Sequence, residues 1–236
     1  MTAVREMKIL LNGDLCGDAD AGAASALLAA VDLANISGDG TTLRRVAAEA
    51  MSRGVPIGAL LVLNHVEAQD VSPRGLTELM SEQIAAVECA LAETGARLRH
   101  VKLCGMLRGL CDERSDLAEA CVDWMELERE GVPLIVGAGG LLHAVAEARG
   151  VPLLREILAG RVYADEARLV PHGQPGAVID DPAEVARRIA EWRKTGYLAL
   201  ADGRRWLVEA ETVGVPADSP RSAEMARAVR EVLGGG

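Results

Sequence analysis

Phenylalanine is absent from this sequence, and aromatic residues as a class are scarce, with three tryptophans and two tyrosines among 236 residues. The chain is nevertheless 50% hydrophobic, so its core must be built from Leu, Val, Ile and Ala. Such a core suits helices layered on a parallel sheet. No apolar run approaches the roughly 20 residues that span a bilayer. The apolar stretch near the N-terminus is also too short for a signal peptide. We therefore expect a cytoplasmic protein without a membrane partner.

Lysine occurs only at positions 8, 102 and 194, and the formal net charge is −10. This charge disfavours nucleic acid and anionic membranes as partners. The five cysteines are odd in number and form no Cys-x-x-Cys pair, which argues against a disulfide framework and a zinc cluster. The dinucleotide-binding, Walker, HExxH and Ser/His/Asp patterns are absent as well. The commonest nucleotide-binding and hydrolase signatures are therefore excluded.

One pattern recurs along the chain: a helix end, then Gly-Val-Pro, then an apolar run, at Gly54, Gly131 and Gly150. Glycine ends a helix in the left-handed conformation, and the proline prevents the helix from resuming. A near-continuous apolar run is typical of a strand buried on both faces. The pattern predicts strands near 7–12, 33–37, 55–63, 98–104, 132–138, 151–158 and 211–216. It predicts helices over 40–53, 72–93, 115–130, 139–149, 181–194 and 219–233.

Seven strands that alternate with helices over short connections indicate one α/β domain spanning residues 1–236. Two parallel architectures fit, an open doubly wound sheet and a closed barrel. Polar residues at several strand ends favour the barrel, in which functional groups gather at the carboxyl ends of the strands. We therefore predict an irregular seven-stranded (β/α) barrel similar to a TIM barrel.

The predicted strand ends carry nine polar residues that we take as candidate site residues: Asn12, Asp14, Asn35, Asp39, Lys102, Cys104, Glu156, Arg161 and Asp218. Structural roles are open for several of them. Asp39 and Asp218 could be helix N-caps, and Glu156 could form an ion pair with Arg161 at the rim. Their joint position at one end of the barrel favours a binding site for a small molecule.

Lys102 is the strongest of these candidates. Strand alternation in "LRHVKLCG" places His100, Lys102 and Cys104 on one face, which we expect to be the barrel interior. A buried lysine needs a carboxylate partner or has a lowered pKa. We predict a catalytic pair of Lys102 and Asp14, with Asn12 orienting the substrate. A buried ion pair without catalytic use is the alternative.

Three features complete the predicted site. Arg161 could hold a substrate carboxylate at the rim, and His172 lies in a turn-rich loop that could touch the substrate. The loops 63–72 and 164–176 are expected to form a lid. Carboxylates without further histidines favour only weakly held hard ions, so we predict no tightly bound transition metal.

Several segments, taken in order, resemble the LamB/YcsF family, which includes one subunit of the bacterial ATP-dependent 5-oxoprolinase. "KILLNGDLCG" is similar to the family's K-I-D-L-N-x-D-x-G-E, and "LRHVKLCGMLR" to L-x-H-V-K-P-H-G-A-L-Y. "REILAGRVY" is similar to S-E-x-F-A-D-R-x-Y, and "VGVPADSPRSAEMAR" to C-V-H-G-D-T-P with its closing helix. The resemblance covers almost the whole chain and implies an irregular seven-stranded β/α barrel, in agreement with the strand count.

The chain departs from the family pattern at many polar positions. Histidines of the pattern are replaced by Leu60, Cys104 and Pro216, and another is lost in a deletion between Ser37 and Gly38. Acidic residues of the pattern are replaced by Leu10, Gly17 and Gly160. Leu60 and three further apolar residues, Leu61, Leu103 and Met106, also differ from the pattern. The pocket is therefore expected to be more apolar than that of the family.

Three functions remain open. The first is a repurposed enzyme that opens or closes a lactam, amide or related cyclic group in a small apolar molecule, as in secondary-metabolite biosynthesis. The second is a non-catalytic binding or regulatory subunit. The third is a true subunit of an ATP-dependent 5-oxoprolinase. We expect no cofactor except ATP in the third case, and either a homo-oligomer or partner subunits.

Overall fold

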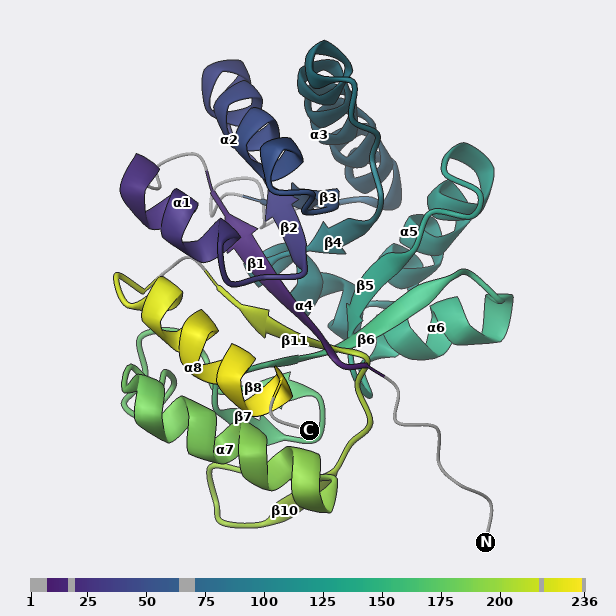
Figure 1. Ribbon diagram of the computed structural model, residues 1–236. Helices are drawn as coiled ribbons and strands as arrows, with labels where there is room; N and C mark the ends of the chain where they lie inside the picture. The colour runs from purple at the N-terminus through teal and green to yellow at the C-terminus, as the bar shows by residue number, and fades with distance from the viewer. Residues whose placement is uncertain (1–7, 17–19, 64–70, 217–218, 235–236) are drawn as a thin grey trace, which may run out of the picture.

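The computed structural model describes residues 8–16, 20–63, 71–216 and 219–234. Seven parallel strands close into a barrel in the order β1-β11-β6-β5-β4-β3-β2, and the helices lie around the outside of the strands (Figure 1). The predicted seven-stranded barrel is thereby confirmed. The barrel strands are β1 (Leu10–Leu15), β2 (Leu33–Ile36), β3 (Ile57–Leu61), β4 (Val101–Leu103), β5 (Leu134–Gly137), β6 (Leu153–Leu158) and β11 (Thr212–Val215).

The first strand lies further along the chain than the sequence predicts. It runs from Leu10 to Leu15 and not over 7–12, so Asn12 and Asp14 lie inside the strand rather than at its exit. Asn12 pairs in register with Leu33 of β2, and Asp14 pairs with Asn35. Since side chains alternate across a strand, Asn12 and Asp14 share the inner face of the barrel. Because Asn12 and Asp14 are polar, the sequence reading placed the end of the strand too early.

The helices are α1 (Ala21–Leu28), α2 (Gly40–Ser52), α3 (Pro73–Thr94), α4 (Gly105–Glu113), α5 (Ser115–Glu128), α6 (Leu141–Arg149), α7 (Pro182–Thr195) and α8 (Ser222–Gly234). Ser72 caps α3 by accepting a hydrogen bond from the Gly75 amide at 3.1 Å. Helix α3 ends at Gly95 in the left-handed conformation, with φ of 75°, as its sequence predicts. Helices α1 and α4 are not among the predicted helices. None of the described helices is long and apolar enough to cross a membrane.

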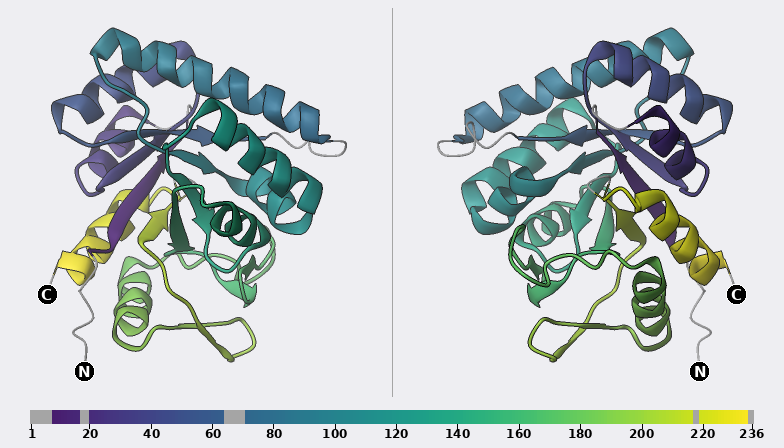
Figure 2. Two further views of the ribbon diagram at one scale, coloured as in Figure 1. Left: turned by 90° about the vertical axis from the view of Figure 1, so that its right-hand side faces the viewer. Right: turned by 90° about the vertical axis from the view of Figure 1, so that its left-hand side faces the viewer.

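Two small antiparallel sheets were also missed by the sequence reading. They pair β7 (Tyr163–Asp165) with β8 (Arg168–Leu169) and β9 (Tyr197–Ala199) with β10 (Arg205–Leu207). The β9–β10 hairpin lies at the opposite edge of the molecule from α2 and α3 (Figures 1 and 2). Each of its strands alternates exposed, buried, exposed. They are half-buried hairpin strands that leave one face open, unlike the barrel strands.

The barrel separates an apolar outer core from a polar interior. Outward side chains of the strands, such as Leu11, Ile36 and Val213, are fully or almost fully buried in the apolar core that includes the helices. The inner face instead holds buried polar side chains together with three glycines, Gly58, Gly137 and Gly214. A Cβ built on each would lie at 2.1 Å from His100, 2.2 Å from Arg108 and 2.1 Å from Glu156, respectively. The inner glycines therefore provide the space that these three polar side chains occupy.

We expect Gly58→Ala to lower the free energy of unfolding by about 1–3 kcal/mol, the usual cost of overpacking a filled interior. The new methyl group would collide with the His100 ring, which is buried and held by Asn35. The matched control is Gly109→Ala in α4, where a Cβ meets nothing within 4 Å. That change should instead add about 0.5–1 kcal/mol through helix propensity. Urea titration of both variants measures the difference, and equal stabilities would show that the interior adapts freely.

Candidate active site

Lys102 lies at the centre of a buried polar cluster inside the barrel. Its Nζ donates to Asp14 Oδ1 at 2.8 Å, to Glu156 Oε1 at 2.6 Å and to Asn12 Oδ1 at 3.0 Å. The side chains of Lys102 and Asp14 are each 3% exposed, and that of Glu156 is 1% exposed. Strands β1, β4 and β6 each contribute to the cluster, so only the closed barrel brings these charges together. All three ammonium hydrogens are used.

Asn12 and Asn35 hold this cluster in place through hydrogen bonds. Asn12 Nδ2 donates to Glu156 Oε1 and to Thr212 Oγ1, both at 2.9 Å, while its Oδ1 accepts from Lys102 and Asn35. Asn35 Nδ2 in turn donates to Asp14 Oδ1 at 2.7 Å. Every hydrogen-bonding position of Asn12 is satisfied within the protein. Asn12 therefore positions Lys102 and Glu156, and a contact of this side chain with a substrate remains a prediction.

His100 completes the support on the β4 side. Its Nε2 lies 2.7 Å from Asn35 Oδ1. Burial, reinforced by the charge of Lys102, lowers the pKa of His100 to about 3, so the imidazole is neutral. Since Asn35 already uses its amide nitrogen as a donor, its oxygen accepts, and His100 must carry its proton on Nε2. The ring is a fixed hydrogen-bond donor rather than a proton-transfer group.

A cavity of about 980 Å³ opens above the cluster. Lys102, Asp14 and Glu156 all line it and form its charged floor. Its apolar lining residues include Leu63, Leu103, Met106, Leu141, Leu158 and Leu169. Leu103 and Met106 therefore line the pocket as the sequence predicts. Leu60 and Leu61 do not belong to this lining, and Leu61 is buried in the outer apolar core.

The ionisation of the cluster is set by burial and by mutual charge. Burial raises the pKa of Asp14 and the neighbouring Glu156 raises it further, against the opposing effect of Lys102. Burial alone would lower the pKa of Lys102, but Asp14 and Glu156 outweigh it and raise that pKa. Burial also raises the pKa of the Cys104 thiol to about 12. Lys102 is therefore a permanent cation, Cys104 is a neutral thiol, and the pKa of Asp14 lies above its ordinary value.

Arg108 and Asp112 belong to the site but were missed by the sequence reading. They lie on α4, and both line the cavity. Arg108 Nη1 lies 3.8 Å from Glu156 Oε2, and Arg108 Nε lies 3.7 Å from Asp112 Oδ2. Asp112 also accepts from the Leu142 amide at 3.2 Å, at the start of α6. The i, i+4 spacing of the two charges on a helix was the available signal, but α4 itself was not predicted.

The remaining candidates have different positions. Asp39 is exposed and caps α2 by accepting from the Thr42 amide at 2.7 Å. The described cavity lining does not include Asp39, which supports its alternative role as a cap. Arg161 lines the cavity, but its guanidinium donates to the carbonyl oxygens of Ala177 and Val170 at 3.3 and 2.8 Å. It therefore braces the segment that follows β6.

Cys104 and His172 both line the cavity, and His172 is exposed. Residues 166–172 of the predicted 164–176 lid lie along the cavity as well. Most of the predicted 63–72 lid lies outside the described residues, and so does Asp218. Among the residues that are described, no group of three or more His, Cys, Asp or Glu side chains is arranged to hold a metal ion. The absence of a bound transition metal remains a prediction.

Comparison with known proteins extends over the whole barrel. The model of the LamB/YcsF family matches residues 9–235. A protein of Streptomyces avermitilis, named as a subunit of 5-oxoprolinase, is 35% identical over 217 residues, covering 88% of this chain and 87% of that protein. A protein of the same name from Streptomyces griseus is 36% identical over 220 residues, with the same coverage of 88% and 87%. The crystal structure of a lactam utilization protein from Thermus thermophilus superposes with a TM-score of 0.85 at 28% identity, covering 97% of both chains.

Proposed function

This chain belongs to the LamB/YcsF family, and we propose that it is an enzyme that opens or closes a cyclic amide in a small, largely apolar molecule. The observation that carries the proposal is the buried lysine between two carboxyl groups at the floor of a cavity. Lys102 contacts Asp14 and Glu156 at 2.8 and 2.6 Å, and all three line the cavity. The relatives are named as a 5-oxoprolinase subunit and as a lactam utilization protein, and these names support a lactam as the reacting group.

The two charged groups have complementary roles in this reaction. For ring opening, the Asp14 carboxylate takes a proton from water as that water adds to the amide carbonyl. The permanent charge of Lys102 stabilises the oxyanion that forms. Asp14 then gives its proton to the nitrogen as the C–N bond breaks, so that one water molecule is added across that bond. Ring closure is the reverse sequence. A raised pKa suits Asp14 to both transfers, because it brings the carboxyl group nearer to neutral pH.

The cavity walls support an apolar substrate. Leu103, Met106, Leu158 and Leu169 line the cavity above the charged floor. An apolar molecule is bound by burial of its own surface, and a confined orientation brings the reacting atoms together. A secondary metabolite with a lactam ring fits this description. The five cysteines form no disulfide bond among the described residues, which supports the cytoplasm as the place of action.

A second candidate is favoured by the names of the relatives. Two proteins about as long as this chain, matched over most of their length, are named as one subunit of 5-oxoprolinase. In that case the protein acts on 5-oxoproline together with partner subunits and with the ATP that the family resemblance implies. The third possibility, a binding subunit without activity, would keep the cavity but not the need for Asp14.

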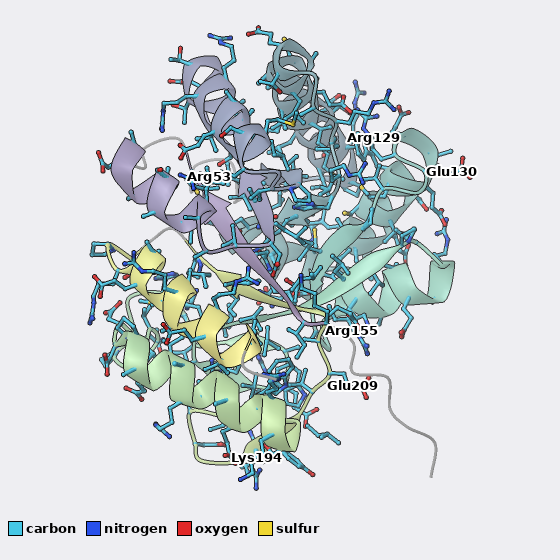
Figure 3. All side chains as sticks on the ribbon, viewed as in Figure 1. Arg53, Arg129, Glu130, Arg155, Lys194 and Glu209 are labelled. Atoms are coloured by element: carbon cyan, nitrogen blue, oxygen red, sulfur yellow. The ribbon has the colours of Figure 1, made fainter. Side chains whose placement is uncertain are left out.

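The test is an assay of purified protein against a panel of lactams that differ in ring size and in apolar substituents. We expect amine release from at least one lactam, faster with apolar substituents, and no release by Asp14→Asn. The matched control is Lys194→Met, an exposed lysine labelled on the outside of α7 in Figure 3. Activity only after addition of ATP and the partner subunits of a 5-oxoprolinase would favour the second candidate. Failure to open or close any lactam under either condition would refute both.

A further inference from the structure

We propose that Arg108 is a positioning residue that holds Glu156 as a fixed counter-charge to Lys102, and thereby leaves Asp14 as the carboxyl group that exchanges a proton in the cavity. The chemical use of this arrangement rests on the proposed function. The arrangement itself, which decides which of two neighbouring carboxyl groups takes up a proton, is measured without any substrate.

The two carboxyl groups beside Lys102 have different surroundings. Glu156 Oε1 accepts from Lys102 at 2.6 Å and from Asn12 at 2.9 Å, while Glu156 Oε2 faces the Arg108 guanidinium at 3.8 Å. Asp14 Oδ1 accepts from Lys102 at 2.8 Å and from Asn35 at 2.7 Å. Glu156 therefore lies between two cations, whereas Asp14 shares one cation with Glu156. Nearby positive charge favours the ionised form of a carboxyl group, so Glu156 is held more firmly as a carboxylate.

The position of Glu156 is also fixed sterically. A Cβ on Gly214 would lie 2.1 Å from Glu156 Oε1, which shows how closely this carboxylate packs on the backbone of β11. Its side chain is only 1% exposed. The Glu156 side chain therefore has no room to move toward a substrate and back, although it lines the cavity.

Arg108 is held just as closely. It is 7% exposed, and a Cβ on Gly137 would lie 2.2 Å from its Nη2. Asp112 contacts it from one side, and the Tyr163 hydroxyl contacts it from another. Burial alone would lower the pKa of Arg108, but Tyr163, Glu156 and Asp112 outweigh it. The guanidinium is therefore a charged group whose place is set by the end of β5 and by α4.

The charge count of the cluster explains why one proton is readily gained. Lys102 and Arg108 contribute two positive charges, and Asp14, Glu156 and Asp112 contribute three negative ones when ionised. Cys104 also lies near Asp14 and is a neutral thiol, because burial raises its pKa to about 12. Uptake of a single proton neutralises the cluster. Burial raises the pKa of Asp112 as well, although Arg108 and the Leu142 amide oppose it. Because Arg108 and Lys102 both act on Glu156, we place the proton that the cluster gains on Asp14 rather than on Glu156.

The experiment follows the side-chain carboxyl carbons of protein labelled with ¹³C-aspartate and ¹³C-glutamate during a pH titration by NMR. The Asp14→Asn and Glu156→Gln spectra assign the two signals. In the unaltered protein we expect Asp14 to titrate at a higher pH than Glu156. Arg108→Met removes the second cation beside Glu156 and should raise the proton affinity of Glu156 at least tenfold, a shift of about one pKa unit, so that the Glu156 titration approaches or passes that of Asp14. Arg108→Lys keeps the charge and should restore most of the original titration.

Two further variants keep the test decisive. Asp112→Asn preserves an acceptor for the Leu142 amide but removes a negative charge beside Arg108, so it should shift Glu156 in the opposite direction and by less. It also remains informative if Arg108→Met does not fold. The matched control Arg187→Met removes an arginine whose side chain is 76% exposed on α7, and it should leave the Glu156 titration unchanged.

Two results would overturn the inference. One is a Glu156 titration that neither Arg108→Met nor Asp112→Asn moves, and the other is a Glu156 signal that titrates above Asp14 in the unaltered protein. A failed lactam assay together with the expected titrations would refute the proposed function and leave the role of Arg108 intact. Turnover of a lactam with unmoved titrations would do the reverse.

Discussion

Replacement of Lys102 by Met is expected to lower the free energy of unfolding by about 3–5 kcal/mol at neutral pH, because it leaves two buried carboxyl groups without the cation between them. Lys102 is the shared donor to Asp14, Glu156 and Asn12. Without it, Asp14 and Glu156, whose side chains are only 3% and 1% exposed, repel each other. Turnover should be lost as well, because the charge that stabilises the oxyanion is gone.

The stability that Lys102 contributes depends on pH in a definite direction. Asp14 and Glu156 outweigh burial and raise the pKa of Lys102 above its ordinary value of 10.5. The stabilisation due to Lys102 is therefore fully present at neutral pH and is lost only in strongly alkaline solution, as the pH rises through the raised pKa. The deficit of Lys102→Met should accordingly shrink when acid protonates the remaining carboxyl groups, and again at strongly alkaline pH.

Urea unfolding at several pH values measures this effect, with Lys194→Met as the control that should match the unaltered protein. The double variant Lys102→Met with Asp14→Asn should recover part of the loss, because a single buried carboxylate then remains. A Lys102→Met protein as stable as the unaltered one at neutral pH would show that the buried charges do not depend on one another.

Asp14→Asn is expected to reduce turnover by roughly 10²–10⁴-fold, the usual contribution of a positioned acid or base, while the melting temperature falls little or rises. The amide has nearly the same shape as the carboxyl group, and its oxygen can still accept from Lys102 and Asn35. It cannot exchange a proton. This variant separates catalysis from stability more cleanly than Lys102→Met, in which both are affected.

The change in stability again has a definite sign. Burial raises the pKa of Asp14 above its ordinary value of 3.8, so the folded state binds this proton more tightly than the unfolded state does. The unaltered protein therefore loses stability as the pH rises from about 4 through the raised pKa. Asp14→Asn lacks this loss, and its stability relative to the unaltered protein should increase over that range.

Calorimetry across the pH range, combined with the lactam assay, checks both parts of the Asp14 prediction. An Asp14→Asn protein that keeps full turnover would show that the Lys102 cluster only fills the barrel. A large loss of stability at every pH would show instead that the carboxylate form of Asp14 is part of the scaffold.

Much of the fold could be predicted because its signals are local. The Gly-Val-Pro units at Gly54, Gly131 and Gly150 mark helix ends and strand starts through backbone conformation alone. Strand alternation placed His100 and Lys102 on one face, and the structure buries both. The strand that was misplaced, β1, failed for a related reason: its inward residues Asn12 and Asp14 are polar, and a polar interior resembles a strand end when only the sequence is read.

The site could be predicted in its members but not in its contacts. The sequence singled out Lys102 and Asp14 as a pair and left Glu156 at the rim as a possible partner of Arg161, whereas the structure places Glu156 against Lys102 as well. Arg108 was missed because α4 follows β4 after a single residue and lacks an N-cap side chain. The sequence likewise could not decide between two roles for Asp39, which the structure places at the start of α2.

The sequence by itself determined the number, order and direction of the barrel strands and the burial of Lys102, since backbone propensity and side-chain alternation act between near neighbours. Only the tertiary structure decided which groups meet inside the barrel. Asn12 and Glu156 are 144 positions apart in the chain, and Lys102 and Asp14 are 88 apart. Closure of the barrel brings them within hydrogen-bonding distance, and the small inner glycines leave room for Glu156, His100 and Arg108. Burial and charge at that distance then set the proton affinity of each group, and no local pattern encodes such an effect.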